Sequence, residues 1–211
     1  DHRDLHSFPT RLSSDLRLDI PEGVTEIKKF GFYNCVSISK ISFPHGILST
    51  ADYSFENCKR LKTVCSPSIE DWCSIKFSDH NSLNGHPFTC SDEGRSLMIG
   101  GKEVIHLILP EGMEAPSAYA FFNCDRITEV TFPESLKGFG SFAGCTQLSR
   151  VNVPNLKKWC SIPSGVIFRN GGGHLFVAGQ EITTSLVIPE GVTEIGNNRF
   201  SGLKELEEVF L

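Results

Sequence analysis

Short runs of alternating apolar and polar residues recur along this chain, and nearly all of them end directly before a proline. Alternation with a period of two is typical of a β-strand with one buried face. Proline closes such a strand because it has no N–H for the next ladder bond. Four of the six spacings between these prolines are 21 to 23 residues. We therefore predict short strands at residues 18–20, 41–43, 64–66, 107–109, 130–132, 151–153, 186–188 and 209–211.

A second signature runs in phase with these strands: Phe, two residues, Cys, two residues and an aliphatic residue. In its last copy Leu203 replaces the cysteine, and Arg199 replaces the small residue that usually precedes the phenylalanine. A period of about 23 residues lies in the range of leucine-rich solenoids. The four full copies are Phe32/Cys35/Ile38, Phe55/Cys58/Leu61, Phe121/Cys124/Ile127 and Phe142/Cys145/Leu148.

This period predicts a fold of stacked coils, because one coil cannot bury its own apolar side. We expect a leucine-rich-repeat solenoid dominated by β-structure, with the short strands in a parallel sheet along one face. The repeated phenylalanines should stack along the coil axis as a ladder. Ile27 and its equivalent Ile195 should point inward on the return side of the coils.

A longer repeat is superimposed on the coils. The phrase IPEGVTEI occurs at residues 20–27 and again at residues 188–195. The pair Trp72-Cys73 recurs 87 residues later as Trp159-Cys160. The repeating unit is therefore two plain coils followed by a third coil that carries an insertion. The chain holds two such units and the start of another.

Each insertion coil contains a predicted short helix. In the first, Ser66 is placed to be the N-cap and Pro67 to occupy the first helical position. Spacing by three and four residues puts apolar side chains on one face of each helix. These residues are Ile69, Trp72 and Cys73 in the first helix, and Leu156, Trp159 and Cys160 in the second.

Each predicted helix is followed by an apolar stretch that two small residues interrupt. The stretches are residues 97–104, with Gly100-Gly101 at the centre, and residues 175–182, with Ala178-Gly179. Such a pattern indicates a β-hairpin with a two-residue turn. We expect both hairpins to project from the edge of the solenoid.

These motifs together resemble the BspA-like leucine-rich repeat family: IPEGVTEI, then a small residue and Phe, then Asn-Cys and an aliphatic residue. The resemblance covers about residues 17–211. It implies a surface or secreted protein of a host-associated bacterium, or of some mucosal protozoa, that takes part in adhesion. The implied partner is a protein or a glycoconjugate, such as a host extracellular protein, and the implied location is extracellular or at the cell surface.

The first sixteen residues, DHRDLHSFPTRLSSDL, have a different origin. They resemble one translated frame of a widely used sequencing adapter, and only Leu12 departs from it. We therefore exclude residues 1–16 from the fold as a non-native tail. The match to an adapter also indicates that the sequence was assembled from bulk reads, such as a metagenome. Residues 17–211 are expected to form a single solenoid that is cut at both ends.

Composition and charge argue against some classes of partner. The net charge is −5, and Lys and Arg form no continuous basic stripe, which argues against nucleic acid. No apolar run reaches about 18 residues, so no membrane insertion is expected within this chain. We expect a monomer.

The eight cysteines suggest either a disulfide framework or a metal site. Packing explains them better, because four of them share one repeat position that Leu203 also fills, and a free thiol behaves as a small buried hydrophobe. A zinc site from His80, His86, Cys90 and Cys73 is conceivable. The second insertion lacks counterparts to His80 and His86, so a polar loop is the favoured interpretation.

Three further motifs have a structural explanation that is preferred to a functional one. Trp72 and Trp159 could anchor a partner, but their helical spacing favours the core. The stretch at residues 138–144 partly resembles a dinucleotide loop, and the Phe-x-x-Cys register already accounts for it. The glycines at residues 171–173 lack the Lys-Ser/Thr of a phosphate loop.

We therefore predict no catalytic residue, no metal site and no cofactor, and no particular binding residues stand out. The chain is expected to be a non-catalytic binding module of a larger surface or secreted protein. Two alternatives remain open: a spacer that presents another domain, or the repeat region of an enzyme whose catalytic domain lies elsewhere.

Overall fold

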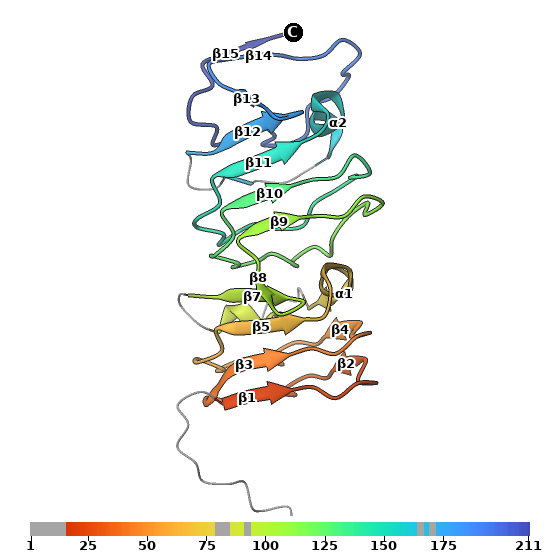
Figure 1. The fold of residues 1–211 in the computed structure, drawn as a ribbon, viewed down its shortest axis with the longest axis vertical. Coiled ribbons are helices and arrows are strands. Elements are labelled where there is room, and N and C mark those ends of the chain that lie inside the picture. Colours follow the sequence, from red (N-terminus) through yellow and green to blue (C-terminus); the bar gives the residue numbers. More distant parts are fainter. Residues whose placement is uncertain (1–15, 79–84, 91–93, 164–166, 169–171) are drawn as a thin grey trace, which may run out of the picture.

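The structure is a computed structural model that describes residues 16–78, 85–90, 94–163, 167–168 and 172–211. These residues form an elongated stack of coils in which strands line one face (Figure 1). The strands of successive coils lie above one another from the N-terminal end to the C-terminal end. The predicted solenoid class is therefore confirmed.

On the sheet face, parallel pairing joins the described strands of neighbouring coils into three groups. Each observed strand lies within a few residues of a run that was predicted from the sequence, and most begin one residue earlier. The first group is β1 (Leu16–Asp19), β3 (Ile38–Ser42), β5 (Thr63–Ser66) and β7 (Ser96–Ile99); the second is β9 (His106–Ile108), β10 (Glu129–Thr131), β11 (Arg150–Val153) and β12 (His174–Val177); the third is β14 (Ser185–Val187) and β15 (Glu208–Phe210).

The two hairpins form as predicted, at the edges of the parallel sheets. β8 (Lys102–Glu103) pairs antiparallel with β7, and β13 (Gln180–Ile182) pairs antiparallel with β12. The residues at both turns have positive φ, as a tight primed turn requires. The first strand of each hairpin joins the parallel sheet, and the second lies at the edge of that sheet, as predicted for edge hairpins. The hydrogen-bonding edge that the next coil would use is taken by the hairpin, which divides the sheet into units.

The return side of the first unit carries a small sheet of β2 (Glu26–Ile27), β4 (Ser49–Thr50) and β6 (Lys76–Phe77). Ile27 is buried there, as predicted. Ile195 is 41% exposed, so the same prediction is wrong for this residue. Ile27 lies in β2, which pairs with β4 of the next coil, whereas Ile195 lies in no strand.

The predicted phenylalanine ladder exists as two stacked pairs. The ring centroids of Phe32 and Phe55 are 5.6 Å apart, and those of Phe121 and Phe142 are 5.2 Å apart. Rings of the first insertion coil, including the buried Phe88, lie between the two pairs along the chain. The side chains of the ladder thus belong to separate units and not to one uninterrupted file.

The corner that carries the cysteines explains the Asn-Cys motif. Asn34, Asn57 and Asn123, each directly before a cysteine, have φ values of 60°, 62° and 57°, and Gly144 takes the same place before Cys145. Asparagine and glycine are the residues that adopt this left-handed conformation most readily. The turn aims the thiols of Cys58 and Cys145 back at the previous coil, where they donate to the carbonyls of Phe32 at 3.1 Å and Phe121 at 3.0 Å.

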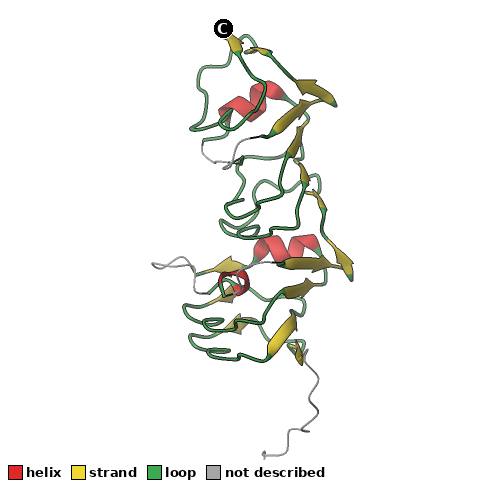
Figure 2. Cartoon of the chain, turned by 90° about the vertical axis from the view of Figure 1, so that its left-hand side faces the viewer, coloured by secondary structure: helices red, strands yellow, loops and turns green. Residues whose placement is uncertain are grey.

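The predicted helices are present as α1 (Ile69–Ser74) and α2 (Leu156–Ser161), at two levels of the stack (Figure 2). A short 3-10 helix, η1 (Pro87–Thr89), follows in the first insertion. The predicted cap was wrong: Ser68 and not Ser66 is the N-cap of α1, and the helix begins at Ile69 and not at Pro67. Ser66 is the last residue of β5, because its backbone still belongs to the parallel ladder.

Candidate binding faces

The outward face of the strands is the surface that a partner can reach. Along β9, Leu107 points inward and is 2% exposed, whereas its neighbour Ile108 is 68% exposed. The same alternation in every coil creates rows of outward side chains along the stack, since parallel pairing sets equivalent residues side by side. One row of the second sheet consists of His106, Glu129, Arg150 and His174, and the adjacent row of Ile108, Thr131, Asn152 and Phe176.

Charged groups on this face of the second sheet compensate one another. The Nε atom of Arg150 lies 3.2 Å from the Glu129 carboxylate, to which Asn152 donates at 2.6 Å. The guanidinium of Arg150 also lies 3.5 Å from the ring centroid of Phe176, a cation–π contact. These contacts hold the long side chains in fixed positions, which lowers the entropy lost when a partner binds.

Apolar side chains remain uncovered beside this network. Ile108 is 68% exposed, and Val187 on the outward side of β14 is 66% exposed. Phe176 is half-buried beneath Arg150. Aromatic residues and arginine are enriched where proteins bind one another, and charged residues are depleted at the centre of such surfaces. We name Ile108, Arg150, Phe176 and Val187 the sheet-face patch.

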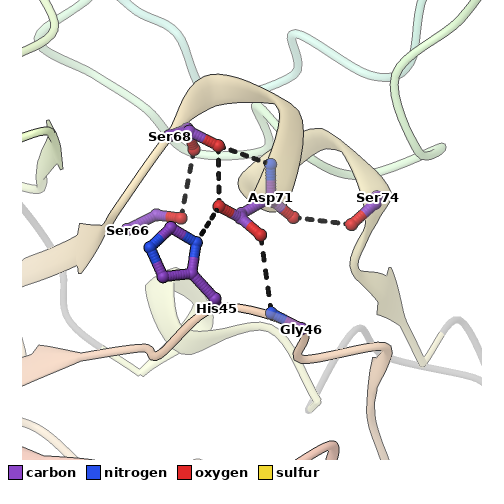
Figure 3. Close-up of polar contacts among 6 residues, drawn as sticks. All are labelled: His45, Gly46, Ser66, Ser68, Asp71 and Ser74. Carbon is purple, nitrogen blue, oxygen red and sulfur yellow. Dashed lines mark hydrogen bonds and ion pairs between the residues drawn. The ribbon is translucent and has the colours of Figure 1, made fainter. Parts of the chain in front are cut away.

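A serine, a histidine and an aspartate come together at the start of α1, which spacing in the sequence did not suggest (Figure 3). Nδ1 of His45 lies 2.9 Å from Oδ2 of Asp71, and the Ser68 hydroxyl donates to the same oxygen at 2.7 Å. Burial alone would raise the pKa of Asp71, but the hydrogen bonds from Ser68 and His45 lower it.

This arrangement differs from that of a hydrolase. In a catalytic triad the histidine lies between the carboxylate and the serine and takes the serine proton. Here Asp71 lies between the other two, and Ser68 instead accepts the Asp71 backbone N–H at 3.0 Å as a helix cap. The group therefore fixes the first turn of α1 to the preceding coil.

The second unit supports this structural role. The positions equivalent to His45 and Asp71 hold Glu134 and Lys158. The Lys158 ammonium donates to the backbone carbonyl of Glu134, and Asn155 caps the helix through the Lys158 N–H. The connection between helix and coil is retained while the titratable groups exchange sign, which a catalytic role would not permit.

The zinc interpretation gains no support from the residues described. His86 is buried, and its Nδ1 atom accepts the Phe88 N–H at 3.1 Å. Burial lowers the pKa of His86 to about 3 and raises the pKa of Cys73 to about 12. Among the described residues no group of three or more His, Cys, Asp or Glu side chains could hold a metal, and His80 lies outside them.

The tryptophans and all of the cysteines except Cys65, which faces outward on β5, belong to the core. All eight cysteines are free thiols, and Cys58, Cys124 and Cys145 at the shared repeat position are buried. Trp72 and Trp159 are 0% and 2% exposed, so they anchor neighbouring coils and no external partner. The stretch at residues 138–144 forms turns of a plain coil with no helix after it, and Gly171 lies outside the described residues.

The architecture of short parallel strands, asparagine corners and stacked coils is that of a leucine-rich-repeat solenoid. Six copies of the BspA type leucine rich repeat region match residues 12–91, 100–169 and 174–211. Because these matches cover most of the chain, it belongs to this family.

Two solved structures are similar at low identity. One is a leucine-rich repeat protein from Bacteroides ovatus ATCC 8483, with 18% identity, a TM-score of 0.47, and coverage of 93% of this chain and 59% of that chain. The other is a leucine rich cell surface protein from Faecalibacterium prausnitzii A2-165, with 16% identity, a TM-score of 0.37, and coverage of 72% and 52%. The chain thus spans somewhat more than half the length of either protein. The comparison with curated proteins finds no match.

Proposed function

We propose that the chain is a non-catalytic recognition module of a cell-surface or secreted protein, and that it binds a protein ligand through the sheet-face patch. The observation that carries this proposal is the pair of outward aliphatic side chains, Ile108 and Val187, at 68% and 66% exposed. They lie on β9 and β14, and between them along the stack β11 carries Arg150, which is already held in place by Glu129 and Phe176. Such a surface combines apolar area with low conformational freedom.

The family supports the location and the mode of action. BspA type repeats occur in surface and secreted proteins that adhere to other proteins or cells, and the chain carries six copies. None of the helices among the described residues is long and apolar enough to cross a membrane. An adhesive role for the chain, with a host extracellular protein as the ligand, is part of the proposal.

The proposal is tested by presenting the chain to an array of purified extracellular-matrix and plasma proteins and measuring affinity for each protein bound. The double variant Ile108→Glu/Val187→Glu places two carboxylates on the patch. We expect it to lose at least about tenfold in affinity, because desolvating a charge inside an apolar contact is costly.

A matched control introduces two glutamates at exposed aliphatic residues that lie away from the outward face of the strands. Leu48 is 61% exposed and Ile195 is 41% exposed, and neither lies on the outward face of the strands. The variant Leu48→Glu/Ile195→Glu should bind within about twofold of the parent chain. Equal loss in both variants would refute the patch, and no binding to any protein of the array would favour the spacer function instead.

A further inference from the structure

A groove of about 580 Å³ lies on the first unit, away from the sheet-face patch. Five cationic side chains line it together with the hydroxyl groups of Ser39 and Thr63. They come from three successive levels of the stack, since β1, β3 and β5 are adjacent strands. The cationic residues are Arg17, Lys40, Lys59, Arg60 and Lys62.

The charge of this groove is largely uncompensated. Arg17 forms an ion pair with Asp19 at 2.8 Å, and the hydrogen bond from Arg17 lowers the pKa of that carboxyl group. Within the part of the chain that the structure describes, Lys59, Arg60 and Lys62 form no ion pair, and all three are exposed. Clustered charges of one sign raise the local concentration of counter-ions. The positive groove therefore stands out in a chain whose net charge is −5, and it corrects the expectation from the sequence that Lys and Arg form no continuous basic stripe.

The second unit shows that the coils do not need these charges. Strand pairing places Arg17, Lys40 and Thr63 side by side in the first unit, and His106, Glu129 and Arg150 in the same register in the second. There the single arginine is paired with Glu129 at 3.2 Å. The positions equivalent to Lys59, Arg60 and Lys62 are Thr146, Gln147 and Ser149. The same backbone thus carries a basic surface in one unit and a neutral one in the other.

We propose that this cationic groove binds a linear polysaccharide that carries sulfate or carboxylate groups. Successive coils lie about 4.8 Å apart, so a chain laid across three levels can contact several cations in turn. The lining supplies only charged and hydroxyl side chains, which suit sugar sulfates and hydroxyls. An acidic protein would require apolar anchors, and none of the residues lining the groove is aromatic or aliphatic.

This site is independent of the proposed protein-binding function. The cationic groove belongs to the β1, β3 and β5 levels, whereas the sheet-face patch belongs to β9, β11, β12 and β14. Either can fail a test while the other stands, because the variants that address them share no residue.

The test measures binding of a heparin-derived decasaccharide to the full chain at two salt concentrations. The variant Lys59→Thr/Arg60→Gln/Lys62→Ser introduces the residues that the second unit already has at these positions. We expect it to weaken binding at least about tenfold and to flatten the salt dependence, since fewer counter-ions are released. Its thermal unfolding should match that of the parent chain.

A control removes the same charge elsewhere. Lys28, Lys102 and Lys204 are exposed and lie outside the groove. The variant Lys28→Gln/Lys102→Gln/Lys204→Gln should bind the decasaccharide within about twofold of the parent, because screening limits the effect of distant charges.

The reciprocal variant, Thr146→Lys/Gln147→Arg/Ser149→Lys, should gain affinity for the decasaccharide, by about threefold or more. Equal loss in the groove variant and the control would overturn the proposal. Tighter binding of a polyglutamate of matched charge would also overturn it, because the partner would then be an acidic protein. Equal binding of a desulfated and carboxyl-reduced decasaccharide would overturn it as well.

Discussion

The two insertion coils pack their equivalent tryptophans differently. Nε1 of Trp72 donates to the carbonyl of Ala120 at 2.7 Å and so joins the first unit to the second. Nε1 of Trp159 is buried without a hydrogen-bond partner among the described residues. Its ring instead stacks on Phe139 at 5.4 Å and lies 4.5 Å from the guanidinium of Arg199.

The residue before the repeated phenylalanine differs in the same way. Ala120 and Arg199 hold equivalent positions, and both are buried. Burial lowers the pKa of Arg199 to about 10, and the side chain donates to the carbonyl of Ile162. Both coils therefore keep a buried tryptophan ring that packs in the core, whereas a hydrogen bond from the indole N–H is present in only one of them.

The largest effect should come from removing either ring. Trp72→Ala and Trp159→Ala should each lower the free energy of unfolding by about 3–5 kcal/mol, because both leave a large cavity in the core. Denaturant unfolding measures the loss. A cost below about 1 kcal/mol at either position would show that the tryptophan does not support its junction.

Acid should weaken the first junction more than the second. His86 lies 6.1 Å from Trp72, ring to ring, and the second insertion has no counterpart. Its pKa is about 3 in the folded chain and 6.5 in a free side chain, so the unfolded state binds the extra proton between these values. As the pH is lowered below about 6.5, His86 should therefore reduce the free energy of unfolding by about 1.4 kcal/mol for each pH unit.

The variant His86→Asn isolates this effect, because its side chain can still accept the Phe88 N–H while it does not titrate. Between pH 6.5 and pH 4.5 it should lose about 2.5 kcal/mol less stability than the parent chain. Unfolding curves at a series of pH values provide the measurement. Identical pH profiles would mean that His86 is not buried in its neutral form.

The indole N–H should matter at one junction only. Trp72→Phe leaves the Ala120 carbonyl without its donor, whereas Trp159→Phe removes a group that had no partner among the described residues. We expect the first change to cost about 1–2 kcal/mol more than the second, the penalty of an unsatisfied buried polar group. Equal costs, determined by denaturant unfolding, would contradict the difference between the junctions.

The smallest effect is expected at Arg199. Arg199→Met keeps an unbranched side chain, shorter by two atoms, and removes a desolvated cation whose Nε and Nη1 atoms have no partner among the described residues. The variant should be more stable by up to about 1 kcal/mol, a gain reduced by the loss of the cation–π contact. A shift of the melting temperature upward is the expected observation, and a clear downward shift would show that the ring contact dominates.

Features that depend on local spacing could be predicted from the sequence. The strands before the prolines, the turns at Gly100-Gly101 and Ala178-Gly179, and the inward-pointing Trp72 all follow from short-range periodicity and turn chemistry. The asparagine before Cys35, Cys58 and Cys124 was also visible in the sequence, and its left-handed conformation supplies the reason.

Features that depend on stacking could not be predicted in this way. The exposure of Ile195 depends on which parts of the chain pack against it. The role of β8 depends on the strand with which it pairs, and that strand is β7. Asp71 meets His45 from 26 residues earlier, and the cationic groove is assembled from three levels of the stack. Aligning the charges of the two units position by position would have revealed that groove.

The claim on which everything else depends is that whole coils stack as equivalent, removable levels. Deleting residues 22–110 removes 89 residues and joins Pro21 directly to the Glu-Gly that follows the equivalent Pro110. This takes out four levels of the sheet, those of β3, β5, β7 and β9. A control deletion of residues 22–99 breaks the register and should not fold.

The most direct test is the maximum dimension of this shortened chain in small-angle X-ray scattering. A solenoid that loses four levels should stay folded and become shorter by about 20 Å, at about 4.8 Å per level. A rounded domain of the same two lengths would shrink by less than about 10 Å. That smaller change, or loss of cooperative unfolding in the shortened chain, would contradict the stacked-coil account.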